Sequence, residues 1–254
     1  MFLRFVRLMV REGAEARLAQ VYRERIIPAL RATDGCRFAG LLAPWRGGDA
    51  HRSLTVWETP QQALAYEESG RYQSLLQEVE PLLSGRTEWR VRLTQSADTS
   101  AAPARLEIPA EGYDFAGEAP AADGAAGGGS LFVRILSVRV DPERLPEFVA
   151  LYTEHVIPAV GRQPGSRGVL LAEGEGWSDR VLSISFWDRE EDAARYESSG
   201  EPERLTGKLK ATFSPIYDWK LTLVEGRDPR ADAPKVATYH LVQGQRLEPG
   251  GEGG

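Results

Sequence analysis

The sequence predicts an α+β protein that consists of two tandem copies of one small domain. Matching residues recur at a constant offset of 130 positions without a gap, as between Trp57 and Trp187. Further pairs at this offset are Phe2/Phe132, Tyr22/Tyr152, Pro28/Pro158, Gly35/Gly165, Glu67/Glu197 and Trp89/Trp219. A period this long is a copied domain rather than a solenoid unit. Strand-type alternation and helix-type spacing follow one another inside each copy, which indicates a mixed domain.

The first predicted strand covers residues 2–10, and its copy covers residues 132–140. Phe2 and Val6 lie on one face of this strand and Leu3 on the other, because successive side chains point to opposite sides. A sheet with two apolar faces needs cover on both sides. The two helices predicted for each copy can cover only one of them.

A helix follows, with apolar residues at helical spacing over residues 18–30 and 148–160. Pro28 and Pro158 lie near its end, where the missing N–H predicts a kink or a stop. A glycine in each copy then turns the chain into a second strand, predicted over residues 37–44 and 167–173.

The third strand ends at a tryptophan, over residues 53–57 and 183–187. One of its faces is apolar, and the other carries small hydroxyl side chains and the indole. Thr59 with Gln62 has the spacing of a capping box for the helix that follows, and Asp188 with Glu191 is predicted to act in the same way. This second helix is predicted to break at the Ser-Gly pairs at 69–70 and 199–200.

The remaining strands and the domain limits follow from the same pattern. A fourth strand is predicted over residues 88–93 and 218–224, and a short fifth strand over residues 105–108 and 235–242. Residues 109–130 are rich in Ala and Gly and predict a flexible linker, and residues 244–254 predict a disordered tail. The predicted domains are therefore residues 1–108 and 131–243.

The order strand, helix, strand, strand, helix, strand is that of a ferredoxin-like βαββαβ domain with an antiparallel sheet. Each such sheet leaves one face without helices, and here that face is apolar. We expect the two sheets to pack face to face within one chain, as an intramolecular pseudo-dimer that forms an α/β barrel. Each fifth strand is expected to reach the edge of the other copy's sheet and to protect it. Further oligomerisation stays open.

Composition and charge exclude several classes of partner. The net charge is −6 and the Lys and Arg residues form no basic run, which argues against nucleic acid. Arg4 and Arg7 interrupt the apolar N-terminus, and no apolar run has the length of a membrane span. Cys36 is the only cysteine, so an intrachain disulfide is impossible and a cytoplasmic location is expected.

Several segments resemble the antibiotic biosynthesis monooxygenase family, a branch of the dimeric α/β-barrel superfamily. The resemblance lies in IIPALRATDG and VIPAVGRQPG, in TVWETPQQALAYEESGRY and SFWDREEDAARYESSGE, and in KVATYHL. It covers nearly the whole chain apart from the linker and tail. It implies that the chain is related to cofactor-independent monooxygenases of aromatic polyketides, haem-degrading enzymes and small quinol oxygenases.

The resemblance argues against haem degradation when it is followed residue by residue. The haem-degrading branch has an axial histidine where this chain has Leu76 and Thr206, and an asparagine near the positions of Val6 and Leu136. The second tryptophan of that branch falls at Tyr66 and Tyr196. We therefore expect no haem and no other cofactor.

The sequence contains few motifs that carry chemistry. The histidines His51, His155 and His240 are not clustered at metal-ligand spacing, which predicts no metal site. The sequence also lacks a phosphate-binding glycine loop and a nucleophile elbow. Cys36 is expected to be a buried small residue.

An aromatic pocket remains as the candidate site. The substrate-binding residues expected are Trp57, Trp187, Tyr22, Tyr152, Arg4 and Arg134, and the catalytic residues expected are His155, Tyr196 and Tyr66. Such rings suit a flat aromatic ligand, an arginine suits its anion, and a neutral histidine can act as a base. In the alternative interpretation the aromatic residues belong to the core, and the arginines and His155 are solvated.

Two functions stay open at this point. One is a cofactor-independent monooxygenase that binds a small aromatic, polyketide-type or quinol-type compound and O2, since such compounds form anions that react directly with O2. The other is a non-catalytic barrel that binds a hydrophobic small molecule or acts as a scaffold. Pocket asymmetry between the copies would favour the enzyme.

Overall fold

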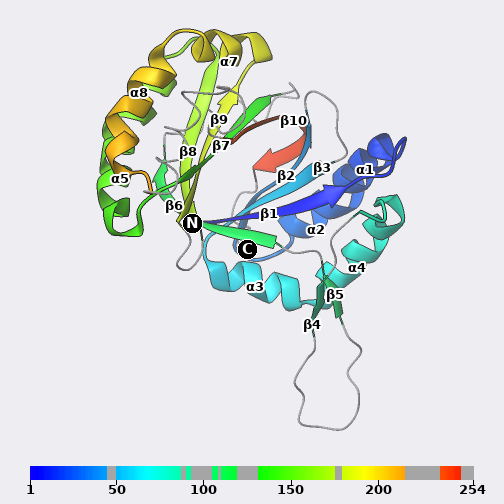
Figure 1. The fold of residues 1–254 in the computed structure, drawn as a ribbon. Coiled ribbons are helices and arrows are strands. Elements are labelled where there is room, and N and C mark those ends of the chain that lie inside the picture. Colours follow the sequence, from blue (N-terminus) through cyan, green and yellow to red (C-terminus); the bar gives the residue numbers. More distant parts are fainter. Residues whose placement is uncertain are drawn as a thin grey trace, which may run out of the picture. The chain divides into compact units, whose positions relative to one another are not determined.

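The computed structural model describes residues 1–44, 50–86, 90–92, 105–107, 110–118, 131–174, 179–214 and 235–246. The chain divides into two compact units (Figure 1). Met1–Ala43 and Gly47–Glu111 make up most of unit one, and Gly112–Leu241 makes up most of unit two. Each unit contains most of one predicted copy.

Unit one has a three-stranded antiparallel sheet with helices that follow its first and third strands. Its elements are β1 (Phe2–Met9), α1 (Glu15–Val21), η1 (Tyr22–Ile26), α2 (Ile27–Arg31), β2 (Cys36–Pro44), β3 (Ala50–Trp57), α3 (Pro60–Glu68), α4 (Gly70–Val79) and η2 (Glu80–Leu82). The strand β3 is central and pairs with both β1 and β2. Phe2 lies opposite Trp57 in this register.

Unit two repeats this order around a central strand β9. Its elements are β7 (Phe132–Arg139), η4 (Pro142–Arg144), α5 (Leu145–Leu151), η5 (Tyr152–Val156), α6 (Ile157–Gly161), β8 (Ser166–Gly174), β9 (Arg180–Trp187), α7 (Glu190–Glu197), α8 (Glu201–Leu209) and η6 (Lys210–Thr212). Phe132 lies opposite Trp187, as Phe2 does opposite Trp57. The predicted tandem ferredoxin-like α+β fold is confirmed.

The strands outside these two sheets agree with the prediction in part. β4 (Arg90–Arg92) and β5 (Arg105–Glu107) form a separate two-stranded sheet, so the described part of the predicted fourth strand, residues 90–92, does not belong to the main sheet. The fifth strand predicted over residues 235–242 is present as β10 (Lys235–Arg246), which pairs with β7 through its residues 235–240. The other predicted fourth strand, residues 218–224, lies outside the described residues.

A strand also lies where a flexible linker was predicted. β6 (Ala110–Glu118) pairs with β8, so the strand beside the second copy's sheet is β6 rather than residues 105–108. The linker prediction is wrong for this segment. The small residues of this segment favour a linker, but Tyr113 and Phe115 stand two positions apart, which is the spacing of one face of a strand.

The first helix of each unit continues past its proline, so Pro28 and Pro158 do not stop it. The N–H of Ile27 bonds to the carbonyl of Tyr22, five residues back, and Ile157 bonds to Tyr152 in the same way. These π-type turns precede the prolines. Because a proline lacks its N–H and presses on the carbonyl four residues earlier, a wider turn lets the helix pass. Tyr22 and Tyr152 each begin such a turn.

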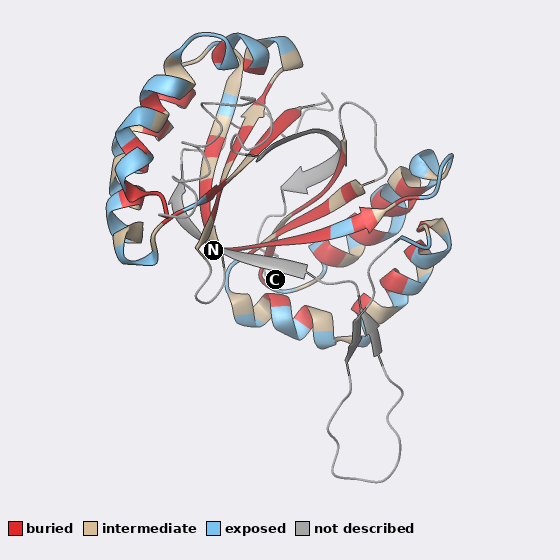
Figure 2. Cartoon of the chain, viewed as in Figure 1, coloured by how far each residue is buried: buried red, intermediate tan, exposed pale blue. Residues whose placement is uncertain are grey.

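One face of each sheet is covered by the helices of its own unit. Figure 2 shows buried residues along the strands and on one side of the helices. In unit one this buried cluster includes Phe2, Val6, Leu18, Leu30 and Trp57. A matching cluster lies in unit two.

The second face of each sheet is also buried. Leu3, Phe5 and Leu54 in unit one, and Val133 and Ile184 in unit two, are each at most 2% exposed and lie outside the helix-covered clusters. The expectation that both faces are buried is therefore confirmed. The face-to-face packing of the two sheets stays a prediction.

Local contacts fix where the helices begin. Thr59 and Gln62 form the predicted capping box of α3. The corresponding prediction for α7 is wrong, because its N-cap is Arg189, without a side-chain cap. Asp188 instead accepts a hydrogen bond from Arg167 Nε at 2.6 Å.

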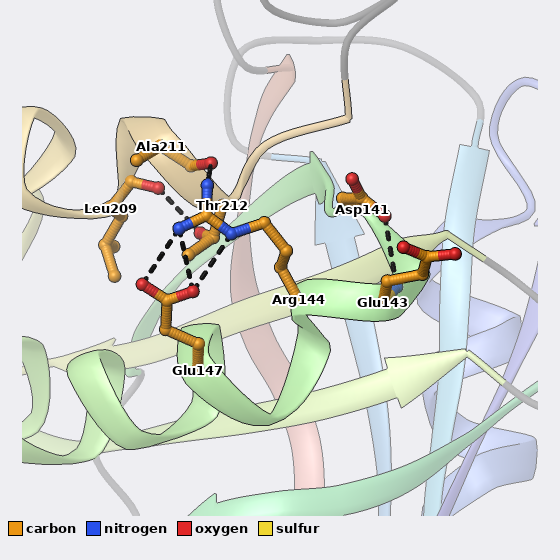
Figure 3. A network of polar contacts seen from close by, with 7 residues as sticks. All are labelled: Asp141, Glu143, Arg144, Glu147, Leu209, Ala211 and Thr212. Carbon is orange, nitrogen blue, oxygen red and sulfur yellow. Dashed lines mark hydrogen bonds and ion pairs between the residues drawn. The ribbon is translucent and has the colours of Figure 1, made fainter.

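In unit two, a polar network ties the start of α5 to the end of the helical region (Figure 3). Arg144 makes a bidentate contact with Glu147, with Nη2 to Oε1 at 2.9 Å, and also donates to the carbonyl of Ala211. These contacts join η6 to the start of α5 and so stabilise the helical layer. No helix in the described part of the chain is both long and apolar enough to cross a membrane.

Candidate functional site

Arg4 is a buried cation on β1, opposite Thr55 of β3. It is 4% exposed. Its Nε donates to the carboxylate of Glu67 on α3, and its guanidinium carbon lies 5.3 Å from the centroid of the Tyr72 ring on α4. A buried charge is costly unless it is paired. Arg4 is therefore not the solvated strand-end arginine of the alternative interpretation.

The surroundings of Arg4 keep it charged. Burial lowers the pKa of Arg4, but the neighbouring Tyr72 and Glu67 raise it through charge and hydrogen bonding, and the net pKa lies above the ordinary value. Arg4 is a fixed positive charge at neutral pH. A fixed buried cation favours the anionic form of any acid placed beside it.

Three tyrosines from three helical segments lie near this cation. Tyr22 begins η1, Tyr66 lies on α3 and Tyr72 lies in the first turn of α4, and all three are buried. Tyr22 is hydrogen-bonded to the hydroxyl of Ser53. Burial raises the pKa of Tyr22 and of Tyr66 above that of a free phenol. At neutral pH both phenols are therefore hydrogen-bond donors and not bases.

A small cavity of about 50 Å³ lies among these side chains, between the sheet and the helices. Its polar lining is Arg4, Tyr22, Ser53, Thr55, Tyr66 and Tyr72, and its apolar lining is Val6, Leu8, Ile26, Leu30, Leu75, Leu76 and Val79. An apolar cavity of roughly 150 Å³ holds one benzene molecule. An aromatic ligand can therefore enter only if a wall side chain moves.

The two strand tryptophans support the tyrosines and do not line this cavity. Trp57 is fully buried, its ring centroid lies 5.2 Å from that of Tyr66, and its Nε1 donates to Thr55 Oγ1 at 2.9 Å. Trp187 stacks on Tyr196 at 5.4 Å and donates to a serine hydroxyl in the same way. With its one donor satisfied, each indole acts as core.

Unit two assembles a related but altered group. Arg134 is 9% exposed and donates through Nε to Glu197 Oε1 at 2.6 Å. Tyr152 and Ser183 share a hydrogen bond of 2.6 Å. Burial raises the pKa of Tyr152 and of Tyr196. The sequence has Pro202 and Thr206 where the first copy has Tyr72 and Leu76.

His155 lies on η5 and is half-buried, with 25% of its side chain exposed. Its Nε2 is 3.7 Å from Oε1 of Glu154, a side chain that is 73% exposed. The corresponding first-copy residue, Arg25, is exposed and ion-paired with Glu78. Arg134 opposes the rise in the pKa of both Tyr152 and Tyr196, and neighbouring glutamates add to the rise at Tyr196. Among the described residues, the charged contact of His155 is with Glu154 and not with a tyrosine, so its role as a base stays a prediction without support from this geometry.

Glu67 and Tyr72 belong to the site but were not predicted as site residues from the sequence. Glu67 could have been found, since it repeats at Glu197 with the same offset that links Arg4 to Arg134, and a buried arginine needs an acid. Tyr72 has no counterpart in the second copy, so a search guided by the repeat passes over it. Within the described ranges, no three His, Cys, Asp or Glu side chains converge as metal ligands.

The fold and the site define a class of protein: a tandem ferredoxin-like α+β chain with a tyrosine-lined cavity between sheet and helices. The family model for antibiotic biosynthesis monooxygenase matches residues 1–77 and 131–204, together more than half of the chain. The chain belongs to the antibiotic biosynthesis monooxygenase family.

Solved structures with the same fold share little sequence with this chain. A candidate monooxygenase of Fusobacterium nucleatum has a TM-score of 0.66 at 8% identity, over 96% of this chain and 94% of that one. One of Lactobacillus acidophilus has a TM-score of 0.65 at 8% identity, over 97% and 96%. An anthrone oxidase-like protein has a TM-score of 0.59 at 12% identity, over 97% and 93%. No functionally curated protein matches the sequence.

Proposed function

We propose that this chain is a cofactor-independent monooxygenase of a small aromatic compound of the phenol, enol or quinol type. The observation that carries the proposal is the buried cation Arg4 on the wall of a cavity that also has three tyrosine side chains. A polar group of this kind inside an otherwise apolar pocket is typical of a ligand site. The similarity to an anthrone oxidase-like protein motivates one of the test compounds.

The chemistry needs the anion of the substrate. Arg4 lowers the pKa of a bound phenol or enol by stabilising its negative oxygen, and the tyrosine hydroxyls donate hydrogen bonds to the same oxygen. The released proton passes to solvent. The apolar wall excludes water from the ring carbon that reacts.

The reaction balances without an external reductant. The substrate anion gives one electron to O2, and the two radicals combine to form a carbon–oxygen bond and a hydroperoxide. Loss of the proton from that carbon then breaks the O–O bond, leaves a carbonyl and releases water. The product has one oxygen more and two hydrogens fewer than the substrate, and the other oxygen atom leaves as water.

The test is oxygen uptake with a single-ring quinol, a dihydroxynaphthalene and an anthrone. We expect Arg4→Met to lower turnover on the order of a hundredfold, the effect of removing a donor from an anion-stabilising site. Arg25→Met is the matched control, because it removes an exposed ion-paired arginine from the same unit, and it should change turnover less than twofold. His155→Ala should also change turnover less than twofold.

A second function rests on the small size of the cavity. If no aromatic compound enters the cavity, the chain is a non-catalytic binding or scaffold protein that keeps the family fold. Absence of oxygen uptake, together with no change in melting temperature with any compound of the panel, would support this alternative. Equal activity of Arg4→Met and wild type would refute the proposed site.

A further inference from the structure

We propose that Tyr72 is the specificity-determining residue of the unit-one site and limits its substrate to a single aromatic ring. This inference rests on the proposed function and adds the substrate class. Tyr72 lines the cavity and stands over the guanidinium of Arg4, so it bounds the space directly next to the charge that would hold the anion.

The position of Tyr72 is fixed by its own helix. Ser69 caps α4 and accepts a hydrogen bond from the Tyr72 N–H at 3.3 Å. The Tyr72 ring meets Tyr66 edge to face at 5.5 Å with an interplanar angle of 71°. Tyr66 in turn packs on Trp57. A ring held by a cap and by an aromatic neighbour is a firm wall rather than a loose gate.

The size of the cavity sets the limit. Its volume of about 50 Å³ is smaller than the roughly 150 Å³ that holds one benzene molecule. Admission of one ring already needs a shift of a wall side chain, and two or three fused rings need far more space next to Arg4. The other large wall residues near this charge are Tyr22 and Tyr66, of which Tyr22 is hydrogen-bonded to Ser53.

The second copy has the same arginine–glutamate ion pair but no counterpart of Tyr72. Pro202 stands at the position of Tyr72 and has neither ring nor hydroxyl. The carboxylate partner of Arg134, Glu197, has a side chain that is 45% exposed, whereas Glu67 beside Arg4 is 17% exposed. The two copies therefore differ in the wall beside the charge, and Tyr72 belongs to the first copy only.

The experiment compares kcat/KM for a single-ring quinol and for a three-ring anthrone in the full chain. Wild type should favour the single ring, and Tyr72→Leu should shift the ratio toward the anthrone at least tenfold. Tyr72→Phe keeps the ring and should keep the wild-type ratio within threefold. Pro202→Ala, the matched change in the second copy, should leave the ratio unchanged. Melting temperatures show whether each variant is folded.

The possible outcomes separate this inference from the proposed function. If Tyr72→Leu turns over both compounds with the wild-type ratio, Tyr72 does not set the size limit, although the enzyme proposal survives. If Tyr72→Phe shifts the ratio as much as Tyr72→Leu, the hydroxyl and not the ring is decisive, and the size limit is wrong. A further outcome is that Arg4→Met loses turnover while the wild-type chain shows no preference for the single ring. In that case the size limit is wrong and the proposed function stands. A wild-type chain without any turnover overturns both.

Discussion

The buried tyrosines are acids that the fold keeps protonated. Burial raises the pKa of Tyr22, Tyr66 and Tyr152 above the value of about 10 for a free phenol. In each unit the arginine beside them opposes this shift but does not cancel it. Their hydroxyls are therefore protonated at neutral pH and can donate hydrogen bonds.

This burial predicts how the protein responds to alkali. The unfolded chain ionises its tyrosines near pH 10, whereas the buried tyrosines of the folded chain stay protonated at that pH. Their contribution to the free energy of unfolding is therefore complete below pH 10 and is lost as the pH rises toward the pKa of the folded state. Tyrosinate absorbance should show a group of late-titrating tyrosines whose ionisation coincides with loss of near-ultraviolet circular dichroism. Tyr22→Phe should remove one of them. Reversible titration of all eight tyrosines near pH 10 in the native state would contradict the prediction.

Cys36 gives a second prediction for a single residue. It is buried, its Sγ contacts the carbonyl oxygen of Phe38, and burial raises the pKa of its thiol to about 12. Since the thiolate is the reactive form, a disulfide reagent at neutral pH should modify native protein at least a hundredfold more slowly than protein unfolded in urea. Equal rates would place the thiol at the surface. The Cys36→Ser variant serves as the blank.

Sequence alone located part of the site. Arg4, Tyr22 and Tyr66 were predicted and do line the cavity. Arg4 is visible in the pattern as a repeated polar residue on an apolar strand, and the two tyrosines are visible as repeated aromatic residues of the helical segments. Trp57 was predicted as a ligand contact, but its place behind Tyr66 depends on helix packing that no periodicity encodes. His155 was chosen because it breaks the repeat, and a difference between copies does not reveal which way a helix residue faces.

At the scale of elements, the turn before β2 and the start of α3 depend on one glycine. Gly35 has a φ of +74°, and a Cβ at this position would collide with the side chain of Gln62. Gln62 closes the capping box with Thr59 and also donates to Asp34. Gly35 is therefore needed for its conformation and also for the space it leaves to the cap.

Two glycines allow these effects to be separated. Gly13 has a φ of +80° but open space around its Cβ position, so Gly13→Ala should cost only the conformational term, roughly 1–2 kcal/mol. Gly35→Ala should cost about 1 kcal/mol more, since it also displaces the cap. Urea unfolding of both variants measures the difference. Equal losses would show that Gln62 moves away freely and that the cap contributes little.

Elements with strong periodicity were predictable, and elements set by distant pairing were not. The alternation over β1 and β3 and the break between α3 and α4 follow from local chemistry. The pairing of β10 with β7, and of β4 with β5, depends on which chain segment meets an open sheet edge. The π-type turn at Tyr22 depends on how the helix accommodates Pro28, for which the sequence supplies only the proline.

At the scale of the whole chain, each unit has a second apolar sheet face that is buried outside its own helix-covered cluster. The sequence predicts that each unit covers the second sheet face of the other. Exposure of such a face costs roughly 25 cal/mol for each Å² of apolar surface. Unfolding of one unit would therefore destabilise the other, and the chain should unfold as one cooperative body.

Matched glycine variants in the two units test this cooperativity. Gly165 corresponds to Gly35, has a φ of +78°, and a Cβ there would collide with Asp192. Gly35→Ala and Gly165→Ala should each shift one common urea transition to a lower midpoint, by about 1–3 kcal/mol in the free energy of unfolding, and the double variant should show the sum. Circular dichroism and tryptophan fluorescence should report the same midpoint. Two separate transitions, each moved by only one of the substitutions, would mean that the units are independent and that their second faces are covered in another way.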